Sequence, residues 1–324
     1  MNILLTGGAG YIGSNVAQSL INKDNQVTIV DNLITGNLKF IPSKANFLNT
    51  DISNEQQITK LLKQNKFDLV MHFAGYVKVD ESFKDPEKYF LNNFEKTKLF
   101  VNFCLNFGLN KFIFSSTAGI YGKVKTNKKV DELDKLDPSN PYALSKLKVE
   151  EFLLSRKEIK SVILRYFNVA GADKKLNSGL VVKNSNNLIK VICEVATNKK
   201  QKLIVNGGDY KTTDGTAVRD FIHISDLSDM HIIIANYLKS GGDSEIYNCG
   251  YGKGYSIKEV IVEMEKILQS NLNYEIGPRR EGDIPFSVAN CDKFKNKFNW
   301  NPKYNNLNYI LNSALNWEKK IDEH

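Results

Sequence analysis

The sequence has few cysteines and histidines, and it has no long apolar segment. The cysteines form no CxxC pair, so we expect reduced thiols in a cytosolic protein, with neither a disulfide framework nor a zinc site. The histidines lack metal-ligand spacing, so we expect no bound metal and assign them to core packing or surface hydrogen bonding. These residues are Cys104, Cys193, Cys249, Cys291, His72, His223, His231 and His324. No run of apolar residues is long enough to cross a bilayer, and no leader-like segment opens the chain.

The chain is basic, with a formal net charge of +8. Most lysines are scattered, and one local cluster comprises Lys123, Lys125, Lys128 and Lys129. No nucleic-acid-binding motif accompanies this cluster. We therefore interpret it as a solvated loop and expect no nucleic-acid partner, although a mildly basic field also suits anionic small molecules.

Apolar runs alternate with helical patterns through the first half of the chain. The segments 3–6, 26–31, 68–73, 111–115 and 161–166 are predicted strands. Between them, 11–22, 58–64, 86–107 and 142–155 are predicted helices. This alternation predicts an α/β fold: a Rossmann-type, doubly wound parallel sheet with ligands at the carboxyl ends of the strands.

The second half is less regular. Helices are expected at 180–198, 225–239 and 256–269, with short strands at 203–205 and 245–248. We interpret residues 1–170 as a nucleotide-binding domain, to which segments around 215–240 return. Residues 171–324 form a smaller, mostly helical substrate domain, and the substrate cleft is expected between the two.

A glycine-rich segment follows the first predicted strand. Gly7, Gly10 and Gly13 allow a tight turn, close approach to a pyrophosphate and close packing of helix on strand. The helix that begins at Tyr11 directs its free N–H groups at the phosphates. About 20 residues further on, Asp31 ends the next strand, as the dinucleotide fingerprint requires. An acid there accepts hydrogen bonds from a ribose and repels a 2′-phosphate, so we expect NAD as cofactor, and not NADP.

A second motif pairs a tyrosine with a lysine one helical turn away. Tyr142 and Lys146 share one face of the predicted helix 142–155. We expect the ammonium of Lys146 to lower the pKa of Tyr142, so that its phenolate forms near neutral pH and the tyrosine acts as an acid–base.

These motifs resemble those of a known family. The chain is similar to the extended short-chain dehydrogenase/reductases, and most of all to the UDP-glucose/UDP-galactose 4-epimerases. The resemblance runs nearly from end to end and is carried by TGGAGYIGS at 6–14, DNL at 31–33, HFAG at 72–75, FSSTAGIYG at 114–122, PYALSK at 141–146, RYFNVAGA at 165–172, DGTAVRDFIHISDL at 214–227 and PRREGD at 278–283.

The resemblance implies specific site residues. Cofactor contacts are expected from the glycine loop and from Tyr11, Ile12, Asp31, Asn32, Asp51, Ile52, Phe73, Ala74, Asn92, Tyr142, Lys146 and Phe167. Thr117 is expected to hydrogen-bond the sugar and joins Tyr142 and Lys146 as a catalytic residue. The UDP-sugar is expected to contact Thr117, Asn168, Asn187, Leu188, Arg219, Arg280, Asp283 and Ser287.

The implied reaction is 4-epimerisation of a UDP-hexose through transient oxidation at C4, with Tyr142 as the acid–base. The substrate is UDP-glucose or UDP-galactose, and a small residue at Ser287 also leaves room for an N-acetyl group. Alternatives are a UDP-xylose/arabinose epimerase, a 4,6-dehydratase and a non-catalytic nucleotide-sugar sensor. The dehydratase is disfavoured because Ala118 and Gly119 stand where an acidic pair follows the threonine in such enzymes. Related homodimers imply a dimer through the helices at 86–107 and 142–155.

Overall fold

The computed structural model describes residues 1–123, 128–182, 185–280 and 282–321. By internal packing the chain divides into two units. The first comprises Met1–Gly122, Leu136–Arg165 and Ser228–Tyr247, and the second Lys123–Lys135, Tyr166–Leu227 and Asn248–His324. Each unit is thus assembled from separate stretches of sequence. Lys125 and His324 lie outside the described residues, so their expected roles remain predictions.

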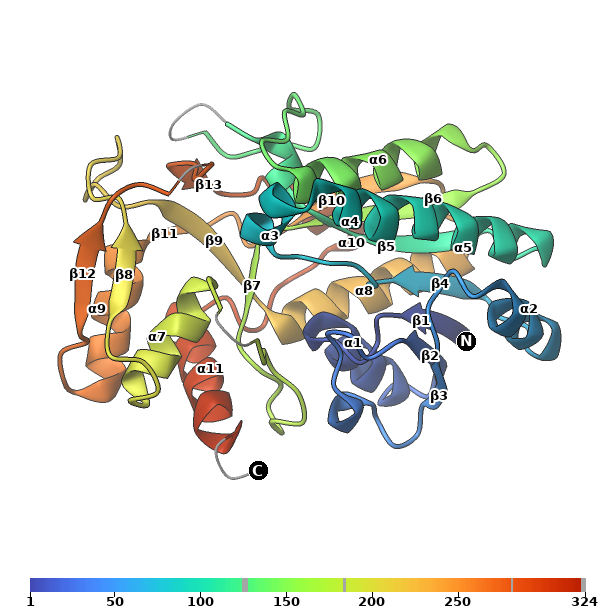
Figure 1. Ribbon diagram of the computed structural model, residues 1–324, viewed down its shortest axis with the longest axis horizontal. Helices are drawn as coiled ribbons and strands as arrows, with labels where there is room; N and C mark the ends of the chain where they lie inside the picture. Colours follow the sequence, from blue (N-terminus) through green and yellow to red (C-terminus); the bar gives the residue numbers. More distant parts are fainter. Residues whose placement is uncertain (124–127, 183–184, 281, 322–324) are drawn as a thin grey trace. The chain divides into compact units, whose positions relative to one another are not determined.

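The first unit is built on a seven-stranded sheet with the order β10-β6-β5-β4-β1-β2-β3 (Figure 1). Its strands are β1 Asn2–Thr6, β2 Gln26–Asp31, β3 Asn46–Asn49, β4 Leu69–His72, β5 Lys111–Thr117, β6 Lys160–Tyr166 and β10 Glu245–Cys249. Strand β1 pairs in parallel with both β2 and β4. The order of the first six strands is that of a Rossmann fold, with its switch point between β1 and β4. The predicted fold class is confirmed.

The helices of the first unit follow the predicted positions closely. They are α1 Tyr11–Ile21, α2 Glu55–Gln64, α3 Val79–Lys84, α4 Pro86–Tyr89, α5 Lys96–Asn106, α6 Pro141–Ser155 and α8 Ile224–Lys239, with short helical turns η1 Leu38–Phe40 and η3 Ala118–Tyr121. Helix α6 begins where it does because Asn140 accepts from the N–H of Ala143 and Pro141 occupies the first turn. The predicted helix 86–107 is interrupted by a π-helical turn, η2 Phe90–Glu95, between α4 and α5.

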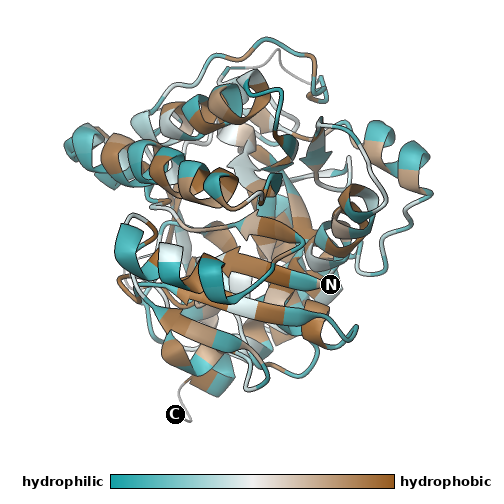
Figure 2. Cartoon of the chain, turned by 90° about the vertical axis from the view of Figure 1, so that its right-hand side faces the viewer, coloured by the Kyte–Doolittle hydropathy of each residue, from teal (hydrophilic) through white to brown (hydrophobic). Residues whose placement is uncertain are grey.

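Apolar side chains of the sheet and of helices α2, α5 and α6 form the core of this unit. Val70, Phe112 and Phe114 on the strands pack with Ile58 of α2 and Phe100 of α5, all at most 1% exposed. Figure 2 shows the strands of the sheet in the colour of hydrophobic residues, whereas the helices alternate between hydrophobic and hydrophilic stretches. This pattern is expected of a sheet buried on both faces by amphipathic helices.

The second unit combines helices with two small sheets. Its helices are α7 Leu188–Ala196, α9 Ile257–Leu268, α10 Asp292–Phe298 and α11 Leu307–Ile321. A four-stranded sheet contains β7 Asn168–Ala170, β9 Val218–His223, β11 Gly254–Ser256 and β13 Phe286–Ser287, and a two-stranded sheet pairs β8 Leu203–Asn206 with β12 Tyr274–Gly277. Apart from β8, the sequence analysis did not predict these strands.

One predicted helix begins later than expected. The prediction placed its start at Leu180, but α7 starts at Leu188 because the side chain of Asn187 accepts from the N–H of Lys190 and caps the helix. Before this cap, the carbonyl of Leu180 accepts from the indole of Trp317 at 3.3 Å. That tertiary contact uses a backbone group that a helix would need for itself.

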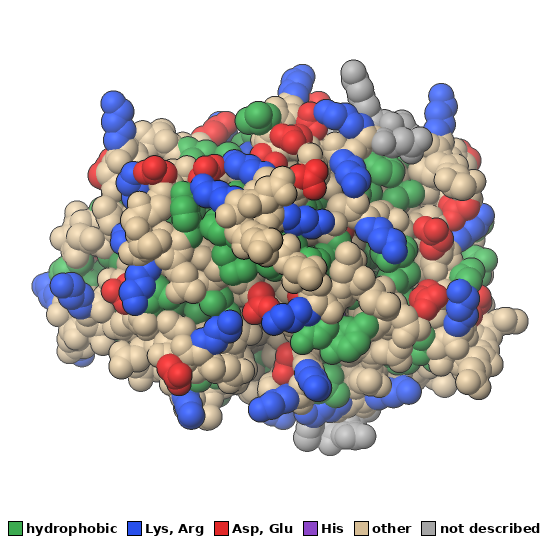
Figure 3. Space-filling view, turned by 180° about the vertical axis from the view of Figure 1, so that it is seen from behind, with side chains coloured by type: hydrophobic (Ala, Val, Ile, Leu, Met, Phe, Trp, Pro, Cys, Tyr) green, Lys and Arg blue, Asp and Glu red, His purple; other side chains and the backbone are tan. Residues whose placement is uncertain are grey.

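The four cysteines are free and buried. No helix in the described ranges is both long and apolar enough to span a membrane. On the face drawn in Figure 3, Lys and Arg side chains are interspersed with Asp and Glu. This mixture matches a solvated charged surface better than a continuous basic patch.

Candidate active site

The glycine loop lies where β1, β4 and α1 meet. A Cβ on Gly7 would stand 2.5 Å from the backbone nitrogen of Ala74, and one on Gly13 would stand 2.3 Å from the carbonyl oxygen of Gly7. Gly7 also has a φ of +71°, which only glycine adopts without strain. The glycines therefore let the two strands and the helix approach closely. Helix α1 starts at Tyr11, directly after the loop, with its N-terminus positioned to receive a phosphate.

Asp31 stands at the carboxyl end of β2, beside this loop. Its two carboxylate oxygens accept from the N–H groups of Ala9 at 3.0 Å and Leu33 at 2.8 Å. Burial raises the pKa of Asp31, and these two hydrogen bonds oppose that rise. An ionised carboxylate has about four acceptor sites, so two backbone bonds leave capacity for the two hydroxyls of a ribose. A Cβ atom at position 36 would lie 2.8 Å from a carboxylate oxygen of Asp31. Gly36 therefore keeps the space beside this carboxylate open.

The next strand end contributes Asp51 and Ile52. Asp51 accepts from the ammonium of Lys96 at 2.7 Å and from the side-chain amide of Asn32 at 3.1 Å. Burial alone would raise the pKa of Asp51, but the hydrogen bonds from Lys96 and Ser53 lower it to about 2. Asp51 is therefore ionised at neutral pH. Lys96 is a partner that the sequence analysis did not identify.

After β4, the residues Phe73 and Ala74 pass close to the glycine loop. The ring of Phe73 packs on His231 with centroids 5.1 Å apart. The side chain of Asn92 donates to the amide oxygen of Asn93, which also accepts from the N–H of Tyr76 at 2.8 Å. Both asparagines lie in the π-helical turn η2, a kind of turn that is frequent at functional sites.

His72 is buried at the end of β4 and has a structural role. Its two ring nitrogens hydrogen-bond the hydroxyls of Thr6 at 2.7 Å and Thr97 at 2.9 Å. Burial, together with the charge of Lys146, lowers the pKa of His72 to about 3, so the ring is neutral at pH 7. Of the two expected roles, core packing is confirmed for this histidine, and its hydrogen bonds are buried where surface bonds were the alternative.

Tyr142, Lys146 and Thr117 come together at the junction of β5 and α6. The side chain of Thr117 hydrogen-bonds the hydroxyl of Tyr142. The ammonium of Lys146 donates to the carbonyl of Ser115 at 2.9 Å and lies 4.9 Å from the centre of the Phe114 ring. Ser115, which contacts Lys146, and Thr117, which contacts Tyr142, are separated by one residue. The end of β5 therefore contacts both members of the tyrosine–lysine pair.

The expected low pKa of Tyr142 is not found in this structure. Burial raises the pKa of Tyr142 to about 12, although the hydrogen bond from Thr117 lowers it. Lys146 is itself buried, and burial lowers its pKa to about 8, against the opposing charge of Glu150. The prediction treated the pair as partly wet. Desolvation is the largest cause of both shifts.

In the second unit, Arg219 on β9 is half-buried, and its guanidinium donates to the carbonyl of Val218 at 2.9 Å. Burial lowers the pKa of Arg219, with Asp283 opposing that effect. Arg280 and Asp283 form an ion pair of 2.7 Å. Guanidinium groups bind phosphate oxygens well, and the expected diphosphate contacts of these arginines stay a prediction.

The remaining substrate-side residues also belong to this unit. Ser287 on β13 is paired with Arg219 on β9 and is 8% exposed. Asn168 starts β7, and Asn187 caps α7, whose first residue is Leu188. Phe167, expected at the cofactor, also lies in this unit, where its N–H donates to the carbonyl of Cys249.

Asp220, next to Arg219, is a residue that sequence reasoning missed. Its carboxylate is fully buried and accepts from the N–H groups of Tyr251, Gly252 and Ala289 at 2.8–3.2 Å. Burial raises the pKa of Asp220 to about 6, although these amides lower it. The carboxylate ties β9 to the segment that follows Ser287. Only its position inside a strand could have indicated a buried role.

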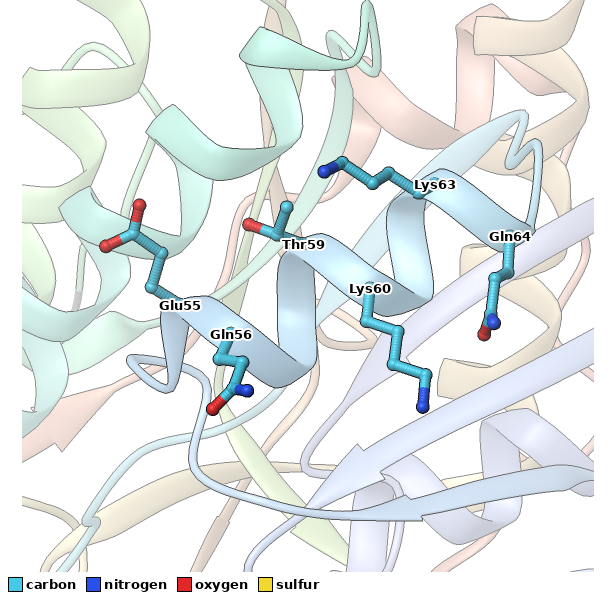
Figure 4. A pocket seen from close by; sticks show the side chains of 6 residues that line it. All are labelled: Glu55, Gln56, Thr59, Lys60, Lys63 and Gln64. Carbon is cyan, nitrogen blue, oxygen red and sulfur yellow. The ribbon is translucent and has the colours of Figure 1, made fainter.

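A separate hollow opens along the surface of α2 (Figure 4). It is lined by Glu55, Gln56, Thr59, Lys60, Lys63 and Gln64. All six come from one helix and none is a predicted site residue. The hollow therefore lies on the outer surface of that helix, and we assign no binding or catalytic role to it.

The glycine loop, Asp31 and the tyrosine–lysine pair define a dinucleotide-dependent enzyme of the Rossmann class. The residues present fit NAD: bulk is excluded at the phosphate loop, and a carboxylate with free acceptor sites stands where a ribose binds. The chain belongs to the NAD dependent epimerase/dehydratase family, whose profile matches residues 3–250. It is therefore an enzyme of epimerase type with NAD as its cofactor.

Individual relatives agree with this assignment. A UDP-glucose 4-epimerase of Azospirillum brasilense is 37% identical over 99% of this chain and 93% of its own length. A UDP-Glc/GlcNAc 4-epimerase structure from Campylobacter jejuni is 41% identical, covers 98% of this chain and 99% of its own, and has a TM-score of 0.85. A UDP-glucose-4-epimerase structure from Stenotrophomonas maltophila, with bound NAD and formylated UDP-arabinopyranose, is 30% identical over 100% and 99% of the two chains, with a TM-score of 0.95.

Proposed function

We propose that this protein interconverts UDP-glucose and UDP-galactose by inverting C4 of the sugar, and that it also accepts the N-acetylated UDP-hexoses. The observation that carries the proposal is the arrangement of Tyr142, Lys146 and Thr117 at one strand end, in the unit that holds the dinucleotide loop. The relatives named above support the UDP-sugar as substrate.

The chain's own residues supply positioning and proton transfer. Tyr142 takes the proton of the sugar 4-hydroxyl and later returns it, and Thr117 orients both hydroxyls. NAD, when bound, supplies reversible oxidation at C4. Lys146 contributes a positive charge that stabilises the phenolate of Tyr142, which matters because burial alone keeps that phenol protonated. Arg219, Arg280 and Asp283 hold the UDP moiety while the sugar turns over.

Two rivals make different demands on the site. A 4,6-dehydratase needs an acid and a base beside the sugar, but Ala118 and Gly119 follow Thr117. A non-catalytic sensor has no need of an acid–base pair, whereas Tyr142 and Lys146 are both present beside Thr117 at one junction, and Lys146 is buried.

The choice of sugar rests on Ser287. Its small side chain is 8% exposed and paired with Arg219, so it lies next to an arginine assigned to the diphosphate. We propose that this position borders the sugar and leaves space for an acetamido group. UDP-xylose and UDP-arabinose lack the C6 hydroxymethyl group and would fill the site less completely, so we expect them to react more slowly.

We also propose that the protein forms a homodimer through the helical surface of η2, α5 and α6. Leu91 of η2, Leu99 of α5 and Phe107, which follows α5, are 40–58% exposed. Leu154 on α6 is 42% exposed. Exposed apolar side chains on adjacent helices are typical of a helical dimer interface.

The deciding experiment supplies purified protein with UDP-galactose and measures UDP-glucose at equilibrium. A panel with UDP-GalNAc, UDP-GlcNAc, UDP-xylose and UDP-arabinose then ranks the substrates. Release of water and formation of a 4-keto-6-deoxy product would identify a dehydratase. UDP-galactose binding without any conversion would identify a sensor.

A further inference from the structure

The residue one turn after Lys146 on α6 is a buried acid. Glu150 is 1% exposed, and it continues the face on which Tyr142 and Lys146 lie. Its partner is Arg165 on β6, which is 2% exposed. The guanidinium binds the carboxylate through Nη2 at 2.7 Å and through Nε at 3.2 Å. A fully buried ion pair with two-point geometry is costly to build and needs further partners to satisfy it.

Those further partners belong to the segment that carries Thr117. The hydroxyl of Ser116 donates to Oε1 of Glu150. Arg165 donates through Nη1 to the hydroxyl of Tyr121 at 2.8 Å, and its guanidinium lies 5.0 Å from the centre of that ring. Ser116 is at the end of β5 and Tyr121 is in the turn η3 that follows. The ion pair therefore fastens the chain on both sides of Thr117.

Ser116 separates the two residues that contact the acid–base pair. Ser115, just before it, accepts the hydrogen bond of Lys146, and Thr117, just after it, binds Tyr142. A shift of Ser116 moves both contacts together. Displacements of about 1 Å at such positions cost roughly 100-fold in rate.

We propose that the buried pair of Glu150 and Arg165 positions the acid–base residues of α6 for the reaction. Glu150 acts through Ser116 on the strand end, and its negative charge also stabilises the ammonium of Lys146. The inference rests on the proposed epimerase reaction and adds positioning residues to it.

The charge effect has a defined sign. The groups that face Lys146 are Glu150 and Tyr142 on its own helix and His72 from β4, which is neutral. Glu150 raises the pKa of Lys146 against the lowering caused by burial. Removing the carboxylate therefore makes Lys146 lose its proton at lower pH. If charged Lys146 is the active form, the alkaline limb of the pH–rate profile moves to lower pH.

The test compares four variants in kcat, KM for UDP-galactose, pH–rate profile and melting temperature. Ser116→Ala removes the hydrogen bond from Ser116 to Glu150 and keeps the ion pair of Glu150 and Arg165. Glu150→Gln removes the negative charge of the carboxylate, and Arg165→Lys keeps a positive charge at position 165. Leu153→Ala, on the same helix and 2% exposed, is the stability-matched control. We expect Ser116→Ala and Glu150→Gln to lower kcat about 10–100-fold with KM within about 2-fold. Glu150→Gln also shifts the alkaline limb, and Arg165→Lys retains the wild-type profile.

Several outcomes overturn the proposal. One is a wild-type kcat in Ser116→Ala, which decides the matter if Glu150→Gln does not fold. Another is an equal loss of kcat in Leu153→Ala. If the wild type is inactive on every UDP-sugar, the proposed function fails, and amide hydrogen exchange then tests the positioning. Faster exchange at residues 115–117 in Ser116→Ala than in Leu153→Ala supports it, and equal exchange overturns it.

Discussion

The ammonium of Lys146 donates a hydrogen bond to the backbone carbonyl of Ser115 over 2.9 Å. This bond joins the middle of α6 to the end of β5, two residues before Thr117. It aims the charge of Lys146 into the buried junction where Tyr142 lies and fixes the reach of the lysine side chain. The acid–base chemistry is therefore controlled by a strand end as much as by the helix that carries the tyrosine.

Replacing Tyr142 by Phe should remove most turnover without loss of ligand binding. The ring remains and the proton-transferring oxygen is lost, so we expect kcat to fall roughly 10²–10⁴-fold. Affinities for NAD and UDP, measured by calorimetry, should change little. Tyr274→Phe, at a 39% exposed position on β12, is the matched control. Near-normal turnover in Tyr142→Phe would mean that another group is the base.

The protein should purify with NAD bound. A reaction that regenerates its cofactor in each turnover has no need to release it, and Asp31 offers acceptors to a ribose. Denaturation followed by enzymatic assay of the supernatant measures the bound nucleotide. Asp31→Asn should weaken the binding of NAD about 10-fold, because the charged acceptor is lost. It should also reduce the preference of the protein for NAD over NADP. Tighter binding of NADP than NAD by the wild type would contradict this assignment.

Gly13→Ala should be far more damaging than Gly10→Ala. The added Cβ at position 13 meets the carbonyl oxygen of Gly7 at 2.3 Å, whereas at position 10 the nearest atom is 3.3 Å away. Overpacking against backbone should lower the free energy of unfolding by about 1–3 kcal/mol in Gly13→Ala. Urea denaturation of both variants checks the difference. Equal stabilities would show that the loop can relax without cost.

Ser287→Tyr should reject N-acetylated sugars selectively. The larger ring fills space beside the sugar, and overfilling costs about 1–3 kcal/mol, or roughly 10–100-fold in discrimination. The measurement is kcat/KM for UDP-GalNAc and for UDP-galactose in both proteins. Equal effects on the two substrates, or no turnover of UDP-GalNAc by the wild type, would show that Ser287 is not the gate. Phe286→Ala tests whether its neighbour occupies the same volume instead.

The pair of Asp51 and Lys96 should make stability depend on acidic pH. The pKa of Asp51 in the folded protein, about 2, lies below its ordinary value of 3.8. Its contribution is therefore complete above about pH 4 and is lost as the pH falls through about 2. Allowing for partial exposure, we expect Asp51→Asn to cost about 1–2 kcal/mol at pH 7.

The measurement for this pair is the urea midpoint of nucleotide-free protein as a function of pH. The difference between wild type and Asp51→Asn should shrink below pH 4. Lys96→Met removes the same interaction, so the double variant should be little worse than either single one. Full additivity of the two effects would show that the side chains act independently.

The local signals of the first unit were sufficient to predict its α/β fold class and all of its strands except β3. The glycine motif, the acid at Asp31 and the alternation of apolar runs are properties of short segments, and right-handed βαβ connections leave few ways to arrange them. Helix α6 could be located in the same way, because Pro141, Tyr142 and Lys146 lie within one continuous segment.

The second unit was harder because its strands are short and irregular in pattern. Strand β9 carries Arg219 and Asp220 side by side, which does not resemble a buried strand. The charge of Asp220 is tolerated there only because three backbone amides from distant segments converge on it. No local window contains that information.

The sequence by itself determined which groups are available: a phosphate loop, a ribose acceptor, and a tyrosine and a lysine on one helical face. The tertiary structure decided their electrostatics. Desolvation favours the neutral form of each, so that the pKa of Tyr142 rises to about 12 and the pKa of the buried Lys146 falls to about 8. The tertiary structure also brought Arg165 of β6 against Glu150, which follows Lys146 by one turn on α6. Burial and the approach of charges depend on which segments meet, and the order of residues along the chain does not specify that locally.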